Sequence, residues 1–419
     1  MMRPLLIGAV VSVAAFAAPA AAQDAAPASD ATRFVLDTAL LFVAGVGVLI
    51  ALTGLCMRDV GLARPQHMFS VCLRTLSGLG VSALAFWLVG YNLIYAIEAG
   101  GLLGEFRVWT PADNDPAATG RASGVFWFFQ MGLAALAAVV VSGAVSERVR
   151  FWPYLVFTAA LSGVIYPIAA SWVRGVGYIS QSWGFYDYGG GTVHIAAGAA
   201  ALAGAIVVGP RPGKYVGGKV RRAEKTALHF SALGAALFLI GWLLATAGME
   251  GSLSSVEAAI SISTAAVNSV VAVAGGVLTA LVMTKVVYKR SGLVSVISGS
   301  IAALVSLAAD PVSPAVWQAA MIGAVGGVIV TVTPPFLDRY RIDDAGFVAP
   351  AHLLCGIWGA AIVPWTNANA WLQGQFIGVA AIAGFTFFMS LLLWVALKYT
   401  AGVRLTPLDE PEPAPAANG

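Results

Sequence analysis

Charged residues are scarce in this chain. Asp, Glu, Lys and Arg make up 10% of its 419 residues, whereas hydrophobic residues make up 59% and the mean hydropathy is +0.84. Soluble domains carry about 25% charged residues, so the composition excludes an ordinary soluble protein and predicts a polytopic membrane protein. Cysteine is rare as well. Cys56, Cys72 and Cys355 are an odd set without paired spacing, which excludes a disulfide framework.

The amino terminus has the features of a secretory signal peptide. Arg3 precedes a short apolar stretch that ends in small residues, with a cleavage site after Ala22. The alternative is an uncleaved first span, for which the apolar run is short. We expect a signal peptide over 1–22, one transmembrane domain over 23–400 and a short disordered cytoplasmic tail over 401–419.

Long apolar runs dominate the rest of the chain. A helix needs roughly 20 apolar residues to cross a bilayer, and eleven runs approach that length. The sequence therefore predicts an all-α polytopic membrane protein with eleven transmembrane helices. Their approximate limits are 34–57, 69–97, 123–145, 151–172, 191–209, 228–249, 256–284, 292–309, 314–335, 347–366 and 373–397.

The few charges follow an alternating pattern along the chain. Loops after the odd-numbered spans are rich in Arg and Lys, which predicts that they face the cytoplasm. The amino terminus is then periplasmic and the carboxyl terminus cytoplasmic, in a bacterial inner membrane. The basic residues are Arg58, Arg64, Arg148, Arg150, Arg211, Lys214, Lys219, Arg221, Arg222, Lys225, Lys285, Lys289, Arg290, Arg339 and Arg341; the other loops carry Glu98, Glu105, Asp113, Asp115, Glu250, Glu257 and Asp310. We interpret the basic loops as topological signals rather than a nucleic-acid site.

Two of the four histidines lie inside apolar spans. His194 is in the fifth span and His352 in the tenth, each within an H-x-x-x-G pattern, whereas His67 and His229 lie at span edges. If spans one to five repeat as six to ten, the two histidines are equivalent. An odd number of spans per repeat inverts the second half, and sites in inverted repeats lie near the bilayer midplane at the repeat interface.

Several uses of such a histidine pair are open. In the simplest interpretation, each imidazole forms its hydrogen bonds with a neighbouring helix. Two ionisable groups at matched depth favour instead a pathway for a small polar solute. A metal site would need a third ligand, and these spans hold no Asp or Glu to supply it. We therefore predict neither a metal nor a cofactor. An enzyme is not favoured, because the sequence shows no nucleophile–base pair.

Five segments of the chain carry a recognisable pattern. They are FWFFQMGLAALAAVVVSGAVSERVRFWPYLVF (126–157), DYGGGTVHIAAG (187–198), LFLIGWLLATAG (237–248), RIDDAGFVAPAHLLCGIWGA (341–360) and AGVRL (401–405). In this order they resemble the Amt/Mep/Rh ammonium transporter family. The resemblance implies a homotrimer of eleven-span protomers, an inverted five-plus-five repeat with a last helix, and a pore through each protomer that His194 and His352 line. The substrate would be ammonium or ammonia.

The family's periplasmic mouth, which recruits the cation with aromatic faces and a serine, differs here. Matching to Phe129, Gln130 and Trp242 places Leu133 and Ala245 at the two gate phenylalanines, Thr246 at an asparagine and Met249 at the serine. A cation over an aromatic ring gains about 0.5–2 kcal/mol, so the loss of the two gate phenylalanines would weaken ammonium capture.

Three further departures concern charged groups. Arg174 stands where the family has a tryptophan, with Trp172 close enough to substitute, and two orientations of Arg174 are open: inward, or outward as a surface arginine. The aspartate before the glycines, Asp187, is displaced by one residue or a gap. Five residues before His352, an acid becomes Phe347.

Three functions remain open at this point. The first is an ammonium or ammonia transporter or channel. The second is an ammonium sensor that acts through a partner, and the third is a channel for another small neutral solute, motivated by the altered mouth. The resemblance implies a PII-type regulator on the cytoplasmic face, but the short tail makes this partner doubtful.

Overall fold

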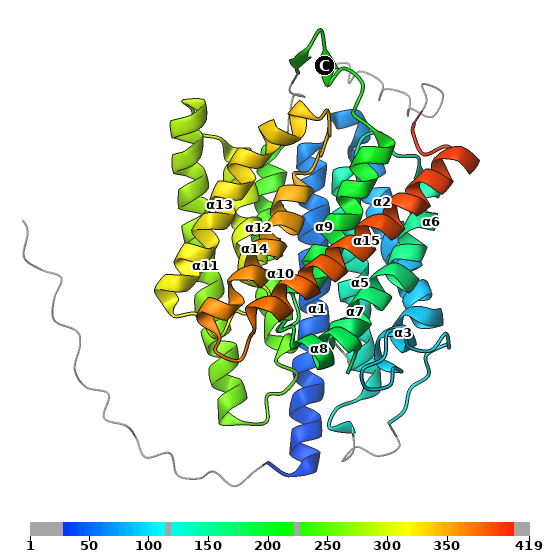
Figure 1. The fold of residues 1–419 in the computed structure, drawn as a ribbon, viewed down its shortest axis with the longest axis vertical. Helices are drawn as coiled ribbons and strands as arrows, with labels where there is room; N and C mark the ends of the chain where they lie inside the picture. The colour runs from blue at the N-terminus through cyan, green and yellow to red at the C-terminus, as the bar shows by residue number, and fades with distance from the viewer. Residues whose placement is uncertain (1–27, 114–118, 175, 222–226, 406–419) are drawn as a thin grey trace, which may run out of the picture.

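The computed structural model describes residues 28–113, 119–174, 176–221 and 227–405. The predicted signal peptide, 1–22, lies outside these residues. Eleven helical segments run through the described part of the chain (Figure 1). They are α1 (Asp30–Leu62); α2 (Pro65–Ala85) continued by η1 (Phe86–Gly90) and α3 (Tyr91–Tyr95); α5 (Ser123–Ala144); α6 (Phe151–Ala160) continued by η2 (Leu161–Ile165) and α7 (Tyr166–Arg174); α9 (Gly191–Val208); α10 (Leu228–Met249); α11 (Val256–Tyr288); α12 (Leu293–Leu307); α13 (Val316–Arg339); η3 (Ala349–Leu354) with α14 (Cys355–Thr366); and α15 (Leu372–Thr400).

The eleven segments follow the eleven predicted spans, so the predicted fold class is confirmed. Nine of the described helices are long and apolar enough to cross a membrane. α12 has 15 residues, and the tenth segment is divided between the π-turns of η3 and α14. A short helix, α8 (Tyr178–Trp183), and a two-stranded hairpin, β1 (Tyr215–Val216) and β2 (Lys219–Val220), lie in loops.

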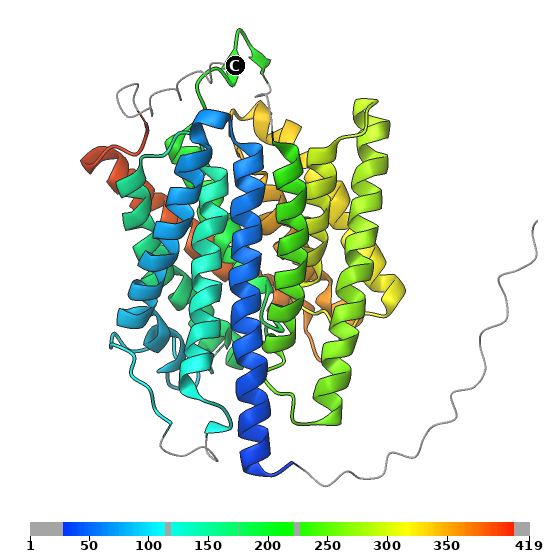
Figure 2. The same ribbon diagram turned by 180° about the vertical axis from the view of Figure 1, so that it is seen from behind.

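The first helices of the two halves, α1 and α10, pack side by side along a seam of small residues (Figure 2). A Cβ atom at Gly54 would lie 2.5 Å from the carbonyl oxygen of Gly234. A Cβ atom at Gly241 would lie 2.3 Å from the amide nitrogen of Ala51. Apolar side chains gain nothing by leaving lipid tails, so membrane helices associate through close backbone packing of this kind.

The loops divide the molecule into two ends. One end carries residues 209–221, with β1 and β2, and residues 401–405, and is here called the basic end (Figure 1). The described connections rich in Arg and Lys also lie at this end. The opposite end, with the amino terminus of α1, is called the acidic end. The alternation of charge along the sequence thus becomes a separation of charge in space, as the positive-inside pattern requires.

A buried ionic cluster closes the basic end. Arg211 binds Asp343 through Nε and Nη2 at 2.8 and 3.0 Å, and its Nη1 donates to Glu147 at 2.8 Å. Glu147 also accepts from Nε of Arg64 at 2.6 Å. Buried charges are tolerated when they are paired and hydrogen-bonded in this way. The cluster ties the loops after the first, third, fifth and ninth spans together.

The residues just after α15 belong to this end. Arg404 pairs with Val149 in an isolated β-bridge and donates to the carbonyl oxygens of Val208 and Pro210. Leu405 donates its amide to Arg148. Residues 401–405, which we expected to begin a disordered tail, therefore have a defined position, and the remainder of that tail lies outside the described residues.

Candidate functional site

His194 and His352 meet in the interior although 158 positions separate them. Their Nδ1 atoms are 3.2 Å apart and their ring centroids 5.0 Å apart, and neither side chain is exposed. His194 lies in the first turns of α9, and His352 lies within the π-turns of η3. The two halves of the chain therefore supply one ring each to a common site, as the matched H-x-x-x-G patterns predicted.

The glycine of each pattern makes room for the opposite histidine's neighbour. A Cβ atom at Gly198 would lie 2.3 Å from the amide nitrogen of Leu353, the residue after His352. A Cβ atom at Gly356 would lie 3.0 Å from Cγ1 of Ile195, the residue after His194. The motif thus has a reciprocal packing function, because each glycine admits the segment that carries the other ring.

Two aromatic side chains of α10 cover the histidine pair. The Trp242 ring lies 4.5 Å from the His194 ring, and Phe238 lies 6.4 Å from His194 and 6.5 Å from His352. Phe238 and Trp242 are nearly parallel, with an interplanar angle of 11°, and both are buried. The sequence predicts Trp242 at this site but not Phe238, although the spacing of four residues between them places both on one helix face.

The histidine pair leaves one donor and one acceptor for a third group. A neutral imidazole has one N–H and one lone pair, so the Nδ1–Nδ1 bond uses the N–H of one ring and the lone pair of the other. One Nε2 then accepts and the other donates. Neither Nε2 atom has a hydrogen-bond partner among the described residues, and both are buried. Such a pair matches a small solute that both donates and accepts.

The donor set does not extend to a metal site. Among the residues that the structure describes, no three His, Cys, Asp or Glu side chains gather closely enough to hold an ion. Zinc in proteins takes at least three such ligands. The surroundings of the pair are aromatic and aliphatic, which suits an uncharged solute better than a dication.

Arg174 points into the protein rather than to the surface. It ends α7, and its Nη1 donates to Oε1 of Gln130 at 3.0 Å, while Nη2 donates to the carbonyl oxygen of Gly189. Gly189 lies two residues before α9 begins. The guanidinium therefore links α5, α7 and the segment leading to His194, which decides between the two orientations left open by the sequence.

Trp172, expected at the same mouth, points instead toward α15. Its indole nitrogen donates to the carbonyl oxygen of Leu102 at 2.8 Å, and its ring packs edge-on against Phe385 at 4.9 Å. Residues two apart on a helix project about 200° apart, so Trp172 and Arg174 cannot share a face. Trp172 does not substitute for an aromatic residue at the position of Arg174.

The other predicted mouth residues lie along α5 and α10. Phe129 packs against the Gly248 position, Leu133 and Ala245 are fully buried, and Met249 covers Gly189. The hydroxyl of Thr246 donates to the carbonyl oxygen of Trp242 in its own helix. Leu133, Ala245, Thr246 and Met249 thus bring no aromatic ring to this end, and Arg174 supplies a positive charge there.

Asp187 has a structural task at this end of α9. Its Oδ1 accepts from the amides of Gly189 and Gly191, and its Oδ2 accepts from the amide and hydroxyl of Thr192. A carboxylate at a helix amino terminus satisfies free N–H groups and complements the helix dipole. The one-residue displacement noted in the sequence therefore leaves an aspartate that caps α9.

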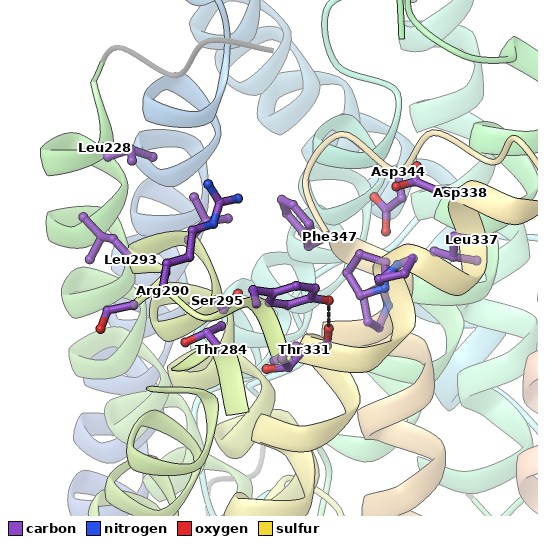
Figure 3. Close-up of a pocket in the computed structure, with 18 of the residues that line it drawn as sticks. Leu228, Thr284, Arg290, Leu293, Ser295, Thr331, Leu337, Asp338, Asp344 and Phe347 are labelled. Carbon is purple, nitrogen blue, oxygen red and sulfur yellow. Dashed lines mark hydrogen bonds between the residues drawn. The ribbon is translucent and has the colours of Figure 1, made fainter. Parts of the chain in front are cut away.

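A cavity of about 410 Å³ opens at the basic end, between the ends of α11 and α13 and the starts of α12 and η3 (Figure 3). Arg290 and Leu293 lie on one side of it, and Phe347 and Asp344 on the other. Phe347, which replaces the expected acid, has a φ angle of 56°. Asp344, three residues earlier, accepts from the amide of Ala349 and thereby caps η3. The sequence pattern does not single out this acid.

Comparisons with known proteins agree with the fold and with the resemblance. The sequence model of the Ammonium Transporter Family matches residues 39–418. A putative ammonium transporter of Synechocystis sp., sll1017, is 30% identical over 94% of this chain and 90% of its own length. Ammonium transporter Amt2 of Archaeoglobus fulgidus is 29% identical over 90% of this chain and 85% of its own.

Solved structures give the same answer. A structure described as a sensor Amt protein superimposes with a TM-score of 0.85 at 26% identity and covers 91% of this chain and 97% of its own. Mep2 of Candida albicans superimposes with a TM-score of 0.79 at 24% identity over 91% of this chain and 88% of its own, a likeness of fold. Members of the matched family are membrane transporters rather than enzymes. This chain, with its helices and its buried histidine pair, belongs to the ammonium transporter family of multi-pass membrane proteins.

Proposed function

We propose that this chain moves ammonium or ammonia across the bacterial inner membrane through a pore that His194 and His352 line. The observation that carries the proposal is the contact of the two Nδ1 atoms at 3.2 Å, with both Nε2 atoms buried and without a protein partner. Ammonia donates through its N–H groups and accepts through its lone pair, so it fits the one acceptor and one donor that the pair leaves over.

A cation without a transferable proton has no equivalent route. Bare ions are costly in a low-dielectric passage, and the rings that lie against the pair are the aromatic side chains of Phe238 and Trp242. Ammonium can enter by losing a proton, whereas potassium cannot. Selectivity then follows from the apolar lining together with the two rings.

The assembly and orientation belong to the same proposal. We propose a homotrimer with one pore in each protomer, with the basic end in the cytoplasm and the acidic end in the periplasm. The amino terminus would be periplasmic after removal of residues 1–22, and the carboxyl terminus cytoplasmic. The loop charges support this orientation.

The test is ammonium-driven uptake by the purified full chain in proteoliposomes. Two signals are recorded after an ammonium pulse: transient current on a solid-supported membrane, and internal alkalinisation with a pH dye. A potassium pulse is the ion control. His194→Ala and His352→Ala should each lower uptake about ten- to hundredfold, since a buried hydrogen-bonding group lost from the path is worth about 1–3 kcal/mol.

His229→Ala is the matched control. His229 is exposed, so this substitution removes the same kind of side chain at a position away from the pair. It should conduct like the unaltered chain. Equal uptake in all three variants would contradict the role of the twin histidines.

The sensor function is the second candidate, favoured by the structural likeness to a protein described as a sensor Amt protein. In that case the ligand would bind at the histidine pair and a partner would read the occupancy. Saturable ammonium binding to the purified chain, with neither current nor alkalinisation in proteoliposomes, would favour the sensor over the transporter.

A further inference from the structure

The acidic-end mouth contains a resident cation at the position that leads to the histidine pair. The guanidinium of Arg174 is held by Gln130 and by the carbonyl oxygen of Gly189. Gly189 is followed closely by the first turn of α9, where His194 donates its amide to Gly190. Trp242, which contacts the His194 ring, also lies against the Gly190 position. Gly189 and Gly190 thus connect the guanidinium of Arg174 to the segment that carries His194.

The charge of Arg174 is fixed in place. Two of its N–H groups are used by neutral acceptors on two other segments, and no described carboxylate forms an ion pair with it. The groups that face it are the hydroxyls of Tyr95 and Tyr166 and the carboxylate of Asp187. Arg is always protonated in proteins, so this charge does not disappear at any working pH.

The two nearby acids already accept hydrogen bonds from the protein. The negative charge of Asp187 partly offsets the positive charge of Arg174. Both carboxylate oxygens of Asp187, however, accept hydrogen bonds at the amino terminus of α9. Glu250 accepts from the hydroxyls of Tyr188 and Ser261 at 2.7 and 2.6 Å. An arriving ammonium ion would therefore meet the like charge of Arg174, while Asp187, the carboxylate that faces this charge, is already engaged with the start of α9.

One nitrogen of the Arg174 guanidinium has no acceptor for its N–H group among the described residues. This nitrogen, Nε, is buried. A buried donor without an acceptor is costly, and a solute with a lone pair would satisfy it. Neutral ammonia has such a lone pair, whereas ammonium has none and can only donate.

We infer that Arg174 is a specificity-determining residue that makes the mouth admit neutral ammonia and exclude the ammonium cation. The inference rests on the proposed function and specifies its substrate. Arg174 occupies the cation position with its own charge and offers Nε to the lone pair of ammonia. The histidine pair then receives a solute that carries no charge, so transport moves no net charge.

The test uses the full chain in proteoliposomes with both signals recorded together. The unaltered chain should alkalinise the interior after an ammonium pulse without producing an ammonium current. Arg174→Gln should gain an ammonium current that saturates with concentration, because the charge is removed while a donor remains. Arg174→Lys should stay without current, because the charge is kept.

Arg107→Gln is the matched control. Arg107 is 62% exposed in the ion pair with Glu105 at the acidic end, so the change removes the same charge from the same face without touching the mouth. It should behave as the unaltered chain does. Arg174→Trp, which removes the charge and fills the volume with a ring, provides a second neutral variant in case Arg174→Gln does not fold, and it should also gain current.

The outcomes separate the inference from the proposed function. An ammonium current from the unaltered chain as large as that of Arg174→Gln would overturn the inference, while alkalinisation lost in His194→Ala would still support transport. If the unaltered chain gave neither signal and Arg174→Gln gave both, Arg174 would be a plug rather than a filter, and the inference would also be overturned. Silence of every variant in both signals would overturn transport and the inference together.

Discussion

Gly198→Ala should disrupt the histidine pair although it adds a single methyl group. The added Cβ would lie 2.3 Å from the amide nitrogen and 2.7 Å from the Cα of Leu353. Both are backbone atoms, so no side chain can rotate to make room. To reach ordinary van der Waals contact, the segment after His352 must retreat by about 1 Å.

The displacement acts on a contact that is already at its limit. The Nδ1 atoms of His194 and His352 are 3.2 Å apart, and N–H hydrogen bonds weaken beyond about 3.2 Å. A shift of that size breaks the bond, which we expect to lower ammonium-dependent alkalinisation about ten- to hundredfold. Overpacking destabilises the fold by about 1–3 kcal/mol, whereas replacing a glycine within a helix by alanine stabilises the helix by about 1 kcal/mol. The chain should therefore still fold.

Two further glycines calibrate the measurement. Gly384→Ala is the matched control, because a Cβ there meets nothing within 4 Å. Gly356→Ala should give an intermediate effect, since its Cβ would meet the flexible side chain of Ile195 at 3.0 Å. Uptake rates are compared at equal protein density, after thermal unfolding in detergent has verified folding. If Gly198→Ala alkalinised vesicles as fast as Gly384→Ala, close packing at Gly198 would not be what positions the pair.

Two predictions concern stability. Burial alone would raise the pKa of Asp343, but the hydrogen bonds from Arg211 and the positive charge of Arg211 outweigh burial and lower the pKa to about 2. The ionised carboxylate therefore stabilises the fold above about pH 4. This contribution is lost as the pH falls from about 4 to 2. The unfolding midpoint of Asp343→Asn in detergent should then be lower than that of the unaltered chain at neutral pH, with the difference shrinking in acid; a constant difference would contradict the linkage. Gly241→Leu should separate α1 from α10 and lower the midpoint strongly, because even a Cβ there lies 2.3 Å from the amide nitrogen of Ala51, whereas Gly80→Leu, where a Cβ meets nothing within 4 Å, should leave it nearly unchanged.

The sequence by itself determined the class of protein, the eleven helices and the two charged ends. These features depend on hydrophobicity and charge along the chain, which the bilayer reads locally, one span at a time. The sequence also singled out His194 and His352, because an imidazole is costly in an apolar span. Their equivalence followed from matched spacing in two halves of the chain.

Only the tertiary structure decided how these residues meet. The rotation of α7 about its axis turns Arg174 inward and Trp172 toward α15. The sequence alone does not show which of these two side chains faces the interior. The close approach at Gly198 and the cover supplied by Phe238 depend on helices distant in the chain. Hydropathy predicts that a residue is buried away from water. Which residue it contacts in the interior depends on the rotation and crossing of the helices, and these arise from the packing of all eleven helices together.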